Sequence, residues 1–322
     1  MLAIDTKLHS EMDGRYLLIR RGPNGEVRGE SEAGESPNLI TNIGLDRMAA
    51  NKDFTNQCYV GGSSSTPLFT DTQLGTLTAT TSSATVKRGV LGVLPYYAWM
   101  EKTYRFDAGA AAGNLSEVGV GWAASGGLFS RALILDPNGN PTSITVLPDE
   151  TLDVVYIYRL YPKLSDTTGS FVLTGSAGGE YDFVFRACNA GNPTNSGGTF
   201  EGWGVCDPSG LPFRMDEFLT TVSGSGGGRG FTGGLGPTTG IPSGDIIASG
   251  TVSIVAEPYG AGSHQSVLAI TLGLSSWNGL LRTMVRGIGP AAYQIEFNPP
   301  IPKTPDDELT LRIAHSWGRR EE

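Results

Sequence analysis

The stretch Glu117-Val-Gly-Val-Gly-Trp122 leads to Leu128-Phe-Ser-Arg-Ala132 and then to Leu152-Asp-Val-Val-Tyr-Ile-Tyr158. Glu117–Trp122 alternates between apolar and small or polar residues, and Leu152, Val154 and Tyr156 fall on one side of the third segment. Such alternation is typical of a half-buried β-strand. Strand starts spaced about 10 residues apart favour a sandwich or a barrel.

The rest of the chain repeats this pattern of short strands and turns. Charged residues make up only 17% of the 322 residues, and 46 are glycine, whereas long amphipathic helices need many Glu, Lys, Ala and Leu residues. One short helix is expected at Ile43 to Ala50, capped by Thr41 or Asn42, with Leu45 and Met48 on its apolar side. We therefore predict an all-β protein with two β-sandwich (jelly-roll-like) domains, an N-terminal hairpin and this single helix.

The turn and loop signals divide the chain into three predicted segments. Residues 1–34 are expected to form a docking hairpin that turns at Gly22-Pro-Asn-Gly25. Residues 35–163 are predicted to form the first sandwich, because the polar stretch that begins at Lys163 resembles a domain boundary. Residues 164–322 are predicted to form the second. Half of residues 223–240 are glycine, so we expect a loop there that only neighbouring subunits would order.

Several classes of function are disfavoured. The formal net charge is −9 and basic residues occur only in pairs, so we expect no nucleic-acid partner. The three cysteines and three histidines show no metal-ligand spacing, and we predict neither a metal nor another cofactor. Near the N-terminus there is no apolar signal segment, and no apolar run is long enough to span a bilayer. The three cysteines are Cys58, Cys188 and Cys206, and the three histidines are His9, His264 and His315.

Four carboxylates are candidates for glycan cleavage, which needs two carboxyl groups across a cleft. The sequence pairs none of them, so outward-facing strand and turn positions are the preferred interpretation, and we predict no enzyme. Glu117 and Arg131 are polar residues within apolar strands, and we expect them to pair across neighbouring strands in a structural role. The carboxylate candidates are Glu117, Asp182, Glu201 and Asp216.

An ordered series of short segments resembles a module of tailed-bacteriophage virion structural proteins of the tail or tail-fibre type. It covers residues 35–162, and the order is more specific than any one segment. The resemblance implies a structural, non-catalytic role and supplies no catalytic residue. The segments are Pro37-Asn-Leu-Ile-Thr-Asn-Ile-Gly-Leu-Asp46, Tyr59-Val-Gly-Gly-Ser-Ser-Ser-Thr-Pro67, Thr70-Asp-Thr-Gln-Leu74, Tyr104-Arg-Phe106, Leu115-Ser-Glu-Val-Gly-Val-Gly121, Leu128-Phe-Ser-Arg-Ala132 and Leu152-Asp-Val-Val-Tyr156.

We therefore expect a virion protein of the tail, tail fibre or baseplate that forms homo-oligomers and binds other virion proteins. It would be made in the host cytoplasm, with no membrane insertion. One alternative is a receptor-binding protein that contacts a host surface glycan or protein, and a glycan-degrading tail enzyme ranks third. Candidate interface or receptor contacts are Trp203, Phe213, Arg229 and Phe231.

Overall fold

Alternating side chains along long strands build the fold. In β18 (Gln265–Leu272) every second residue is buried, and in β1 (Thr6–Arg21) the buried positions also recur with a period of two. Such strands place one side-chain row in a core and the other toward solvent. The computed structural model describes residues 6–30, 36–49, 54–91, 93–175, 177–188, 224–288 and 291–321. Strands take up 58% of the residues and helix 3%, which confirms the all-β, sandwich-type prediction.

The chain divides into two compact units that differ from the predicted domains. Unit 1 comprises residues 1–11, 89–98 and 160–318, and unit 2 comprises residues 12–88, 99–159 and 319–322. The division falls within strands, because β1, β7 (Ala84–Leu91), β8 (Tyr97–Phe106) and β13 (Thr151–Tyr161) each contribute residues to both units. The predicted boundary at residue 163 thus lies a few residues beyond the end of β13, and the N-terminal hairpin is divided between the units.

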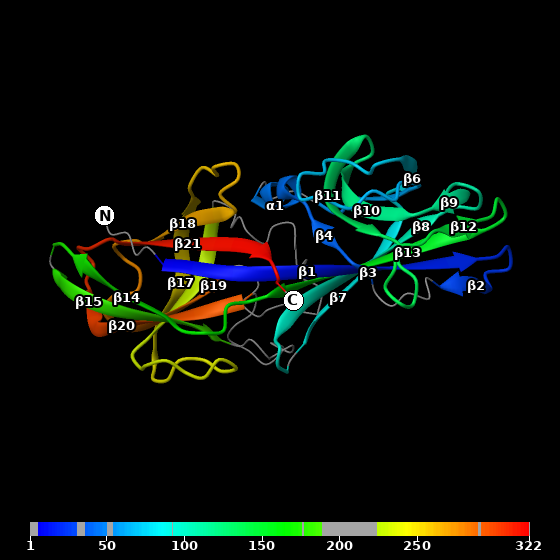
Figure 1. Cartoon of the computed structure of the whole chain (residues 1–322). Helices are drawn as coiled ribbons and strands as arrows, with labels where there is room; N and C mark the ends of the chain where they lie inside the picture. Colours follow the sequence, from blue (N-terminus) through cyan, green and yellow to red (C-terminus); the bar gives the residue numbers. More distant parts are fainter. Residues whose placement is uncertain are drawn as a thin grey trace. The chain divides into compact units, whose positions relative to one another are not determined.

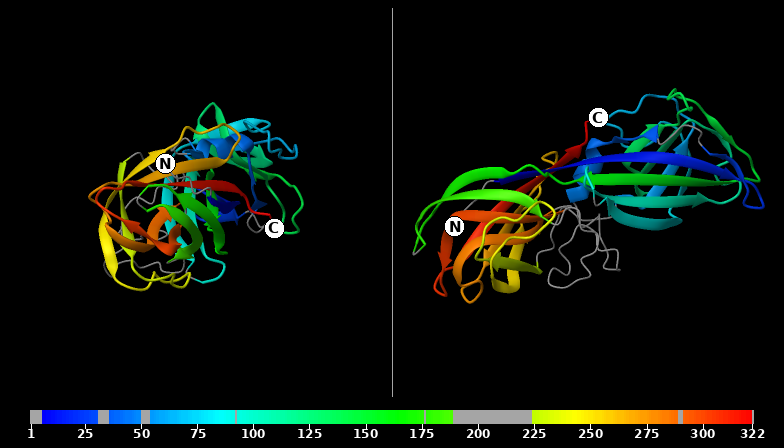
Figure 2. Two further views of the ribbon diagram at one scale, coloured as in Figure 1. Left: turned by 90° about the vertical axis from the view of Figure 1, so that its left-hand side faces the viewer. Right: turned by 90° about the horizontal axis from the view of Figure 1, so that it is seen from below.

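Unit 1 is a run of antiparallel strands, drawn in Figure 2 as a curved sheet in yellow to red with green strands at one side. Phe171, Tyr181, Phe183 and Phe297 form an aromatic cluster in its core. In hydrogen-bonded order the strands are β14 (Thr167–Leu173), β15 (Gly179–Cys188), β20 (Ala291–Lys303), β19 (Gly279–Ile288), β16 (Gly224–Phe231), β17 (Ile246–Ala256), β18 and β21 (Leu309–Arg319), followed by the first part of β1.

The first part of the glycine-rich stretch corrects the prediction of a loop at 223–240, whereas residues 232–240 lie outside the strands. Residues Gly224–Phe231 form β16, which pairs along its length with β17, and Arg229 to Phe231 also pair with β19. Gly230 shows why glycine suits this strand: a Cβ there would lie 2.8 Å from Leu281 Cδ1 and 3.2 Å from the Trp277 ring. Cross-strand hydrogen bonds compensate for the entropy lost by the glycines.

Unit 2 contains a second sheet besides the later part of β1, β13, β8 and β7. This sheet has the order β4-β11-β10-β5-β6, while β2 and β3 pair with β1 and β9 pairs with β12. Figure 1 labels β4, β11, β10 and β6 of this sheet. Aromatic contacts, Tyr16 with Tyr156 and Phe54 with Phe129, form the core. The remaining bounds are β2 (Val27–Glu30), β3 (Ser36–Pro37), β4 (Leu39–Ile40), β5 (Gln57–Gly61), β6 (Leu77–Thr81), β9 (Gly113–Leu115), β10 (Glu117–Ala123), β11 (Gly126–Leu133) and β12 (Ile144–Val146).

The one helix of the described residues, α1 (Asn42–Ala49), lies beside β11 and confirms the predicted position. Thr41 is its N-cap, because the Thr41 hydroxyl accepts a 2.9 Å hydrogen bond from the Gly44 N–H. Leu45 and Met48 are buried, as the spacing predicted. Among the described residues, no helix has the length and apolar character needed to cross a bilayer.

Candidate functional site

One face of the β4-β11-β10-β5-β6 sheet carries the polar pair singled out in the sequence. Arg131 on β11 stands opposite Gly119 on β10, and Glu117 lies two residues before Gly119. Because side chains alternate along a strand, Glu117 and Arg131 project from the same face. The opposite row of β10, including Val118 and Val120, is fully buried in the unit 2 core.

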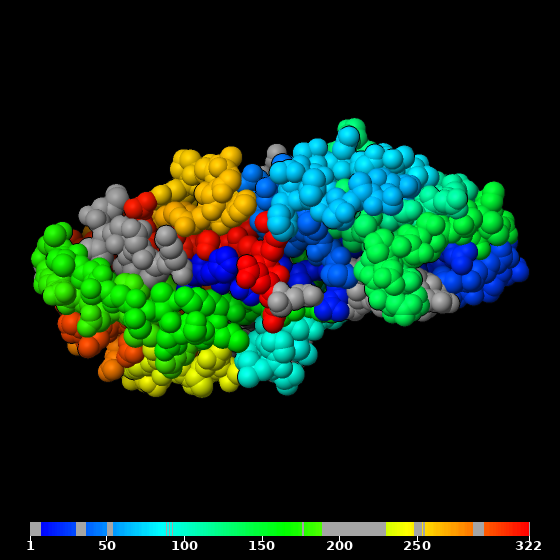
Figure 3. Space-filling model, in the orientation of Figure 1, coloured from blue at the N-terminus to red at the C-terminus, as the bar shows by residue number. Residues whose placement is uncertain are grey.

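A long loop covers this polar face. It joins β5 to β6 and comprises residues 62–76, and we call it the crossing loop. Figure 3 shows the segment in light blue on the surface of unit 2. Its ends are joined by backbone bonds, including a 3.0 Å bond from the Gly62 N–H to the Thr76 carbonyl. Residues Leu68 and Phe69 on the loop are 57% and 51% exposed, so the loop presents apolar side chains to solvent.

Arg131 holds the middle of the crossing loop. Its guanidinium donates hydrogen bonds to Glu117 Oε2 at 2.9 Å, to Asp71 Oδ2 at 2.6 Å and to the Ser65 carbonyl at 2.9 Å. The Asp71 carboxylate also accepts a 2.9 Å bond from the Leu68 N–H. The Arg131 side chain is only 3% exposed, and its planar fork satisfies three acceptors at once.

Glu117 holds the two ends of the loop. Its carboxylate accepts backbone N–H bonds from Ser63 at 3.2 Å, from Gly75 at 3.1 Å and from Thr76 at 2.8 Å. The Glu117 side chain is 0% exposed. An isolated buried charge would be very unfavourable, but this ion pair has hydrogen-bond partners on both sides. The predicted pairing of Glu117 with Arg131 is confirmed, and the carboxylate oxygens of Glu117 are occupied rather than open to a substrate.

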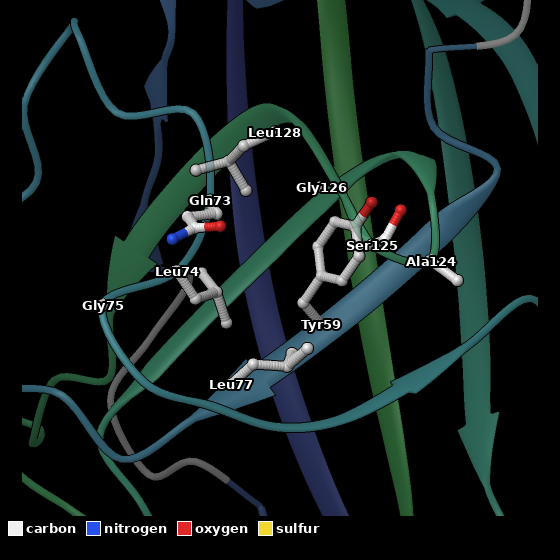
Figure 4. A pocket seen from close by; sticks show the side chains of 9 residues that line it. All are labelled: Tyr59, Gln73, Leu74, Gly75, Leu77, Ala124, Ser125, Gly126 and Leu128. Carbon is white, nitrogen blue, oxygen red and sulfur yellow. The ribbon is translucent and has the colours of Figure 1, made fainter.

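A hollow of about 180 Å³ lies beside the polar network, where the crossing loop leaves part of the same face uncovered. Figure 4 shows the Tyr59 ring and the leucine side chains directed into it. Tyr59, Leu74 and Leu128 form a buried cluster. Gly119 lies beneath, where a Cβ would come within 3.0 Å of both Leu74 and Leu128. The lining residues are Tyr59, Gln73, Leu74, Gly75, Leu77, Ala124, Ser125, Gly126 and Leu128.

The chemistry of the hollow is neutral and mainly apolar. The Tyr59 hydroxyl donates a 2.6 Å bond to the Ala123 carbonyl, and burial raises the pKa of this phenol to about 12, so it stays protonated at neutral pH. Gln73 and Ser125 are exposed and supply an amide and a hydroxyl. No charged side chain is among the described residues that line the hollow. The site therefore suits a small uncharged group better than an ion.

Two of the predicted contact residues lie in a described strand of unit 1, and two lie in a part of the chain that the structure does not describe. Phe231 is 1% exposed and clusters with Cys188 and Val285, so it belongs to the core of unit 1 and is not available to a receptor. Arg229 lies in β16, with its backbone opposite Ser249 and Val285. Trp203 and Phe213 lie outside the described residues, as do the carboxylate candidates Glu201 and Asp216 and the thiol Cys206. Asp182 is exposed on β15.

Three further candidates, the thiols of Cys58 and Cys188 and the imidazole of His315, are buried. Cys58 and Cys188 are free thiols, and burial raises the pKa of each, that of Cys188 to about 12, which disfavours the reactive thiolate. His315 lies in unit 1 and shares a 2.9 Å hydrogen bond between its Nε2 and Ser10 Oγ. Within the described ranges, no three His, Cys, Asp or Glu residues form a group that could hold a metal ion.

Sequence reasoning missed Asp71 and Lys303. Asp71 occurs in a loop without periodicity, so no sequence signal linked it to Arg131, 60 residues away. The Lys303 ammonium is buried and donates to Asn278 Oδ1 at 3.2 Å and to the Thr304 and Leu274 carbonyls at 3.1 and 3.4 Å. A lysine at the end of a proline-rich strand resembles a surface residue in the sequence.

No protein-family model, curated protein or solved structure matches this chain.

Proposed function

We propose that this chain is a non-catalytic structural component of a tailed-bacteriophage virion, placed in the tail, tail fibre or baseplate as a homo-oligomer. The resemblance over residues 35–162 supports this proposal. The segments that carry it lie in β3, β4, α1, β5, the crossing loop, β8, β9, β10, β11 and β13, and all of their residues belong to unit 2. They are therefore parts of one architectural unit rather than scattered matches.

The observation that carries the proposal is the structural role of the Glu117 and Arg131 side chains. Both charges hold a loop in place, since Glu117 accepts three backbone N–H groups and Arg131 binds Asp71 and Ser65. A rigid loop with exposed Leu68 and Phe69 offers a preformed contact surface. A virion protein needs such surfaces for assembly, whereas a glycosidase would need a carboxyl group that can reach its substrate.

The hollow at Tyr59 favours one second candidate, a receptor-binding protein. A neutral, partly apolar cavity with an amide and a hydroxyl at its rim could contact an uncharged host surface group. This alternative is compatible with a place in the tail, because tail proteins and receptor-binding proteins can share one particle.

The experiment that tests the proposal is to locate the chain on particles. Antibodies raised against the purified chain are applied to density-purified phage particles from the host that carries the gene, and gold labels are imaged by electron microscopy. We expect labels on the tail and the chain in the particle proteome. Its absence from purified particles, with abundant free protein in the lysate, would overturn the virion role.

The purified chain also tests the proposal that the protein is not catalytic. Purified chain is incubated with polysaccharide extracted from the host surface, and new reducing ends are measured. We expect none above a heat-treated control. Cleavage that is lost in Glu117→Gln while the fold is retained would contradict the structural role.

A further inference from the structure

The ends of the sheets differ in how they are protected against pairing with other chains. Among the described strands of five or more residues, three stand at the end of a sheet: β6, β7 and β14. Such edges present unpaired N–H and C=O groups and are commonly blocked by lysine or other charges. Strand β7 follows this rule, because the Lys87 side chain is 74% exposed on it.

Strands β6 and β14 do not follow it. Neither Leu77-Thr-Ala-Thr-Thr81 nor Thr167-Thr-Gly-Ser-Phe-Val-Leu173 contains a charged residue or a proline. Both are largely solvent-exposed. In a chain that carries a formal charge of −9 and protects β7 with lysine, two unprotected edges are available for pairing with another strand.

The two open edges are also complementary. Beside β6 lies the hollow, to which Leu77 of β6 itself contributes. Its volume of about 180 Å³ is below the roughly 300–1,000 Å³ of small-molecule sites and suits a single side chain. On β14 the alternation that buries Phe171 and Leu173 turns Val172 outward, where it is 62% exposed. One edge therefore carries an apolar recess and the other an apolar side chain.

We propose that β6 pairs with β14 of a second copy of this chain, and that Val172 of that copy enters the hollow beside Tyr59 and Leu74. Strand addition supplies main-chain hydrogen bonds, and the recess supplies selectivity for the side chain. Because the two edges differ, the contact is heterologous and leads to a ring or a filament. This inference rests on the homo-oligomeric part of the proposed function and not on a place in the virion.

The test uses the full chain with one edge blocked at a time. Thr78→Lys adds a charge to β6, and Thr168→Lys adds one to β14; both positions are exposed. Val86→Lys on β7, an edge that already carries lysine, is the matched control. Sedimentation velocity is measured over a range of concentrations. We expect wild type and the control to associate, and each blocked variant to remain monomeric.

Mixing the two blocked variants distinguishes this arrangement from symmetric pairing. The Thr78→Lys chain keeps β14 open and the Thr168→Lys chain keeps β6 open, so a 1:1 mixture should form a dimer and nothing larger. A dimer of Thr78→Lys alone or of Thr168→Lys alone would overturn the proposal, as would a mixture that stays monomeric. Circular dichroism checks each fold, and Thr80→Lys with Ser170→Lys is a second pair at exposed positions of the same strands.

The substitution Val172→Ser tests whether Val172 enters the hollow of the second copy. We expect association to weaken about 10-fold, equivalent to about 1.4 kcal/mol, and Val86→Ser to leave it unchanged. Equal association of wild type and Val172→Ser would refute the part assigned to Val172. A wild-type chain that is monomeric at every concentration would overturn the whole inference, even if antibodies label phage tails. Self-association of a chain that is absent from particles would overturn only the virion proposal.

Discussion

Glu117 and Arg131 lose almost all contact with water under the crossing loop, and protein hydrogen bonds replace that water. Replacing one partner by an apolar side chain leaves the other charge buried without compensation, which costs more than the pair contributes. A network of this kind contributes conformational specificity, because one loop geometry satisfies all of its donors and acceptors. Apolar residues could cover the face as well, but they would not specify where Ser63, Gly75 and Thr76 must lie.

Arg131→Met should therefore lower the free energy of unfolding by about 3–5 kcal/mol, measured by urea denaturation. Arg282→Met is the matched control, because the Arg282–Glu296 pair is exposed at the arginine and such pairs contribute about 1 kcal/mol or less. Equal destabilisation by both substitutions would show that burial of Glu117 has no special cost.

His315 makes stability depend on pH. Burial, with a smaller effect of nearby His9, lowers the pKa of His315 to about 3, whereas the unfolded chain has a histidine pKa near 6.5. Between these values the unfolded state binds more protons, so stability rises with pH across this window and is lost as pH falls from about 6.5 toward 3. The slope is at most about 1.4 kcal/mol per pH unit.

His315→Gln should flatten that part of the curve, since glutamine does not titrate. The free energy of unfolding of both proteins is measured by urea denaturation between pH 4 and pH 7. The difference between the two proteins cancels the contribution of the carboxylates, which both proteins share. A His9→Gln variant serves as control for the more exposed histidine. An unchanged slope in His315→Gln would exclude His315 as the source.

At the scale of elements, the crossing loop combines exposure with rigidity. Its apolar Phe69 is half exposed, yet the Arg319 guanidinium lies 4.1 Å from the centre of its ring, and Asp71 fixes the adjacent turn. Exposed loops are ordinarily the first sites of proteolysis, because cleavage needs an unfolded segment. Hydrogen bonds from both ends and the middle of this loop oppose such local unfolding.

Limited digestion with chymotrypsin should therefore spare Phe69 in the native chain and cleave there at least about tenfold faster in Arg131→Met, because a loss of about 1.4 kcal/mol or more raises the open population tenfold. Mass spectrometry of the fragments measures the rate at that bond. Arg282→Met, which lies in unit 1, should digest like the native chain. Rapid cleavage of native protein at Phe69 would contradict a rigidly held loop.

The whole molecule is divided within strands rather than at a linker. Unit 1 includes the first residues of β1, where Leu8 and Ser10 are buried and the Leu8 carbonyl accepts a 3.2 Å bond from Ser316 Oγ. A fragment comprising residues 164–322 lacks this strand. It would leave one edge of β21 without its hydrogen-bonded neighbour and His315 without its Ser10 partner.

We expect the 164–322 fragment to lack a cooperative thermal transition, whereas the full chain has one. Near-ultraviolet circular dichroism and calorimetry measure both. The matched control is the same fragment mixed with a 1–163 fragment, which restores the missing strand. A 164–322 fragment that melts cooperatively by itself would support the boundary predicted from the sequence.

The sequence alone predicted the all-β fold, the short helix with a cap at Thr41 or Asn42 and the pairing of Glu117 with Arg131. These features depend on local periodicity, on capping chemistry and on polar residues in otherwise apolar strands, all of which are visible over short windows. The assignment of Gly224–Phe231 to a loop was wrong, because glycine propensity is a weak guide once strands on both sides supply hydrogen bonds.

Only the tertiary structure decided what the exposed and buried positions do. It placed Phe231 in a core, brought Asp71 and Ser65 to Arg131, and left the hollow at Tyr59 beside an open edge. These outcomes depend on which strands become neighbours, and the neighbours are often tens of residues apart along the chain. Long-range pairing is selected by the summed burial and hydrogen bonding of the whole sheet, so no short stretch of sequence contains it.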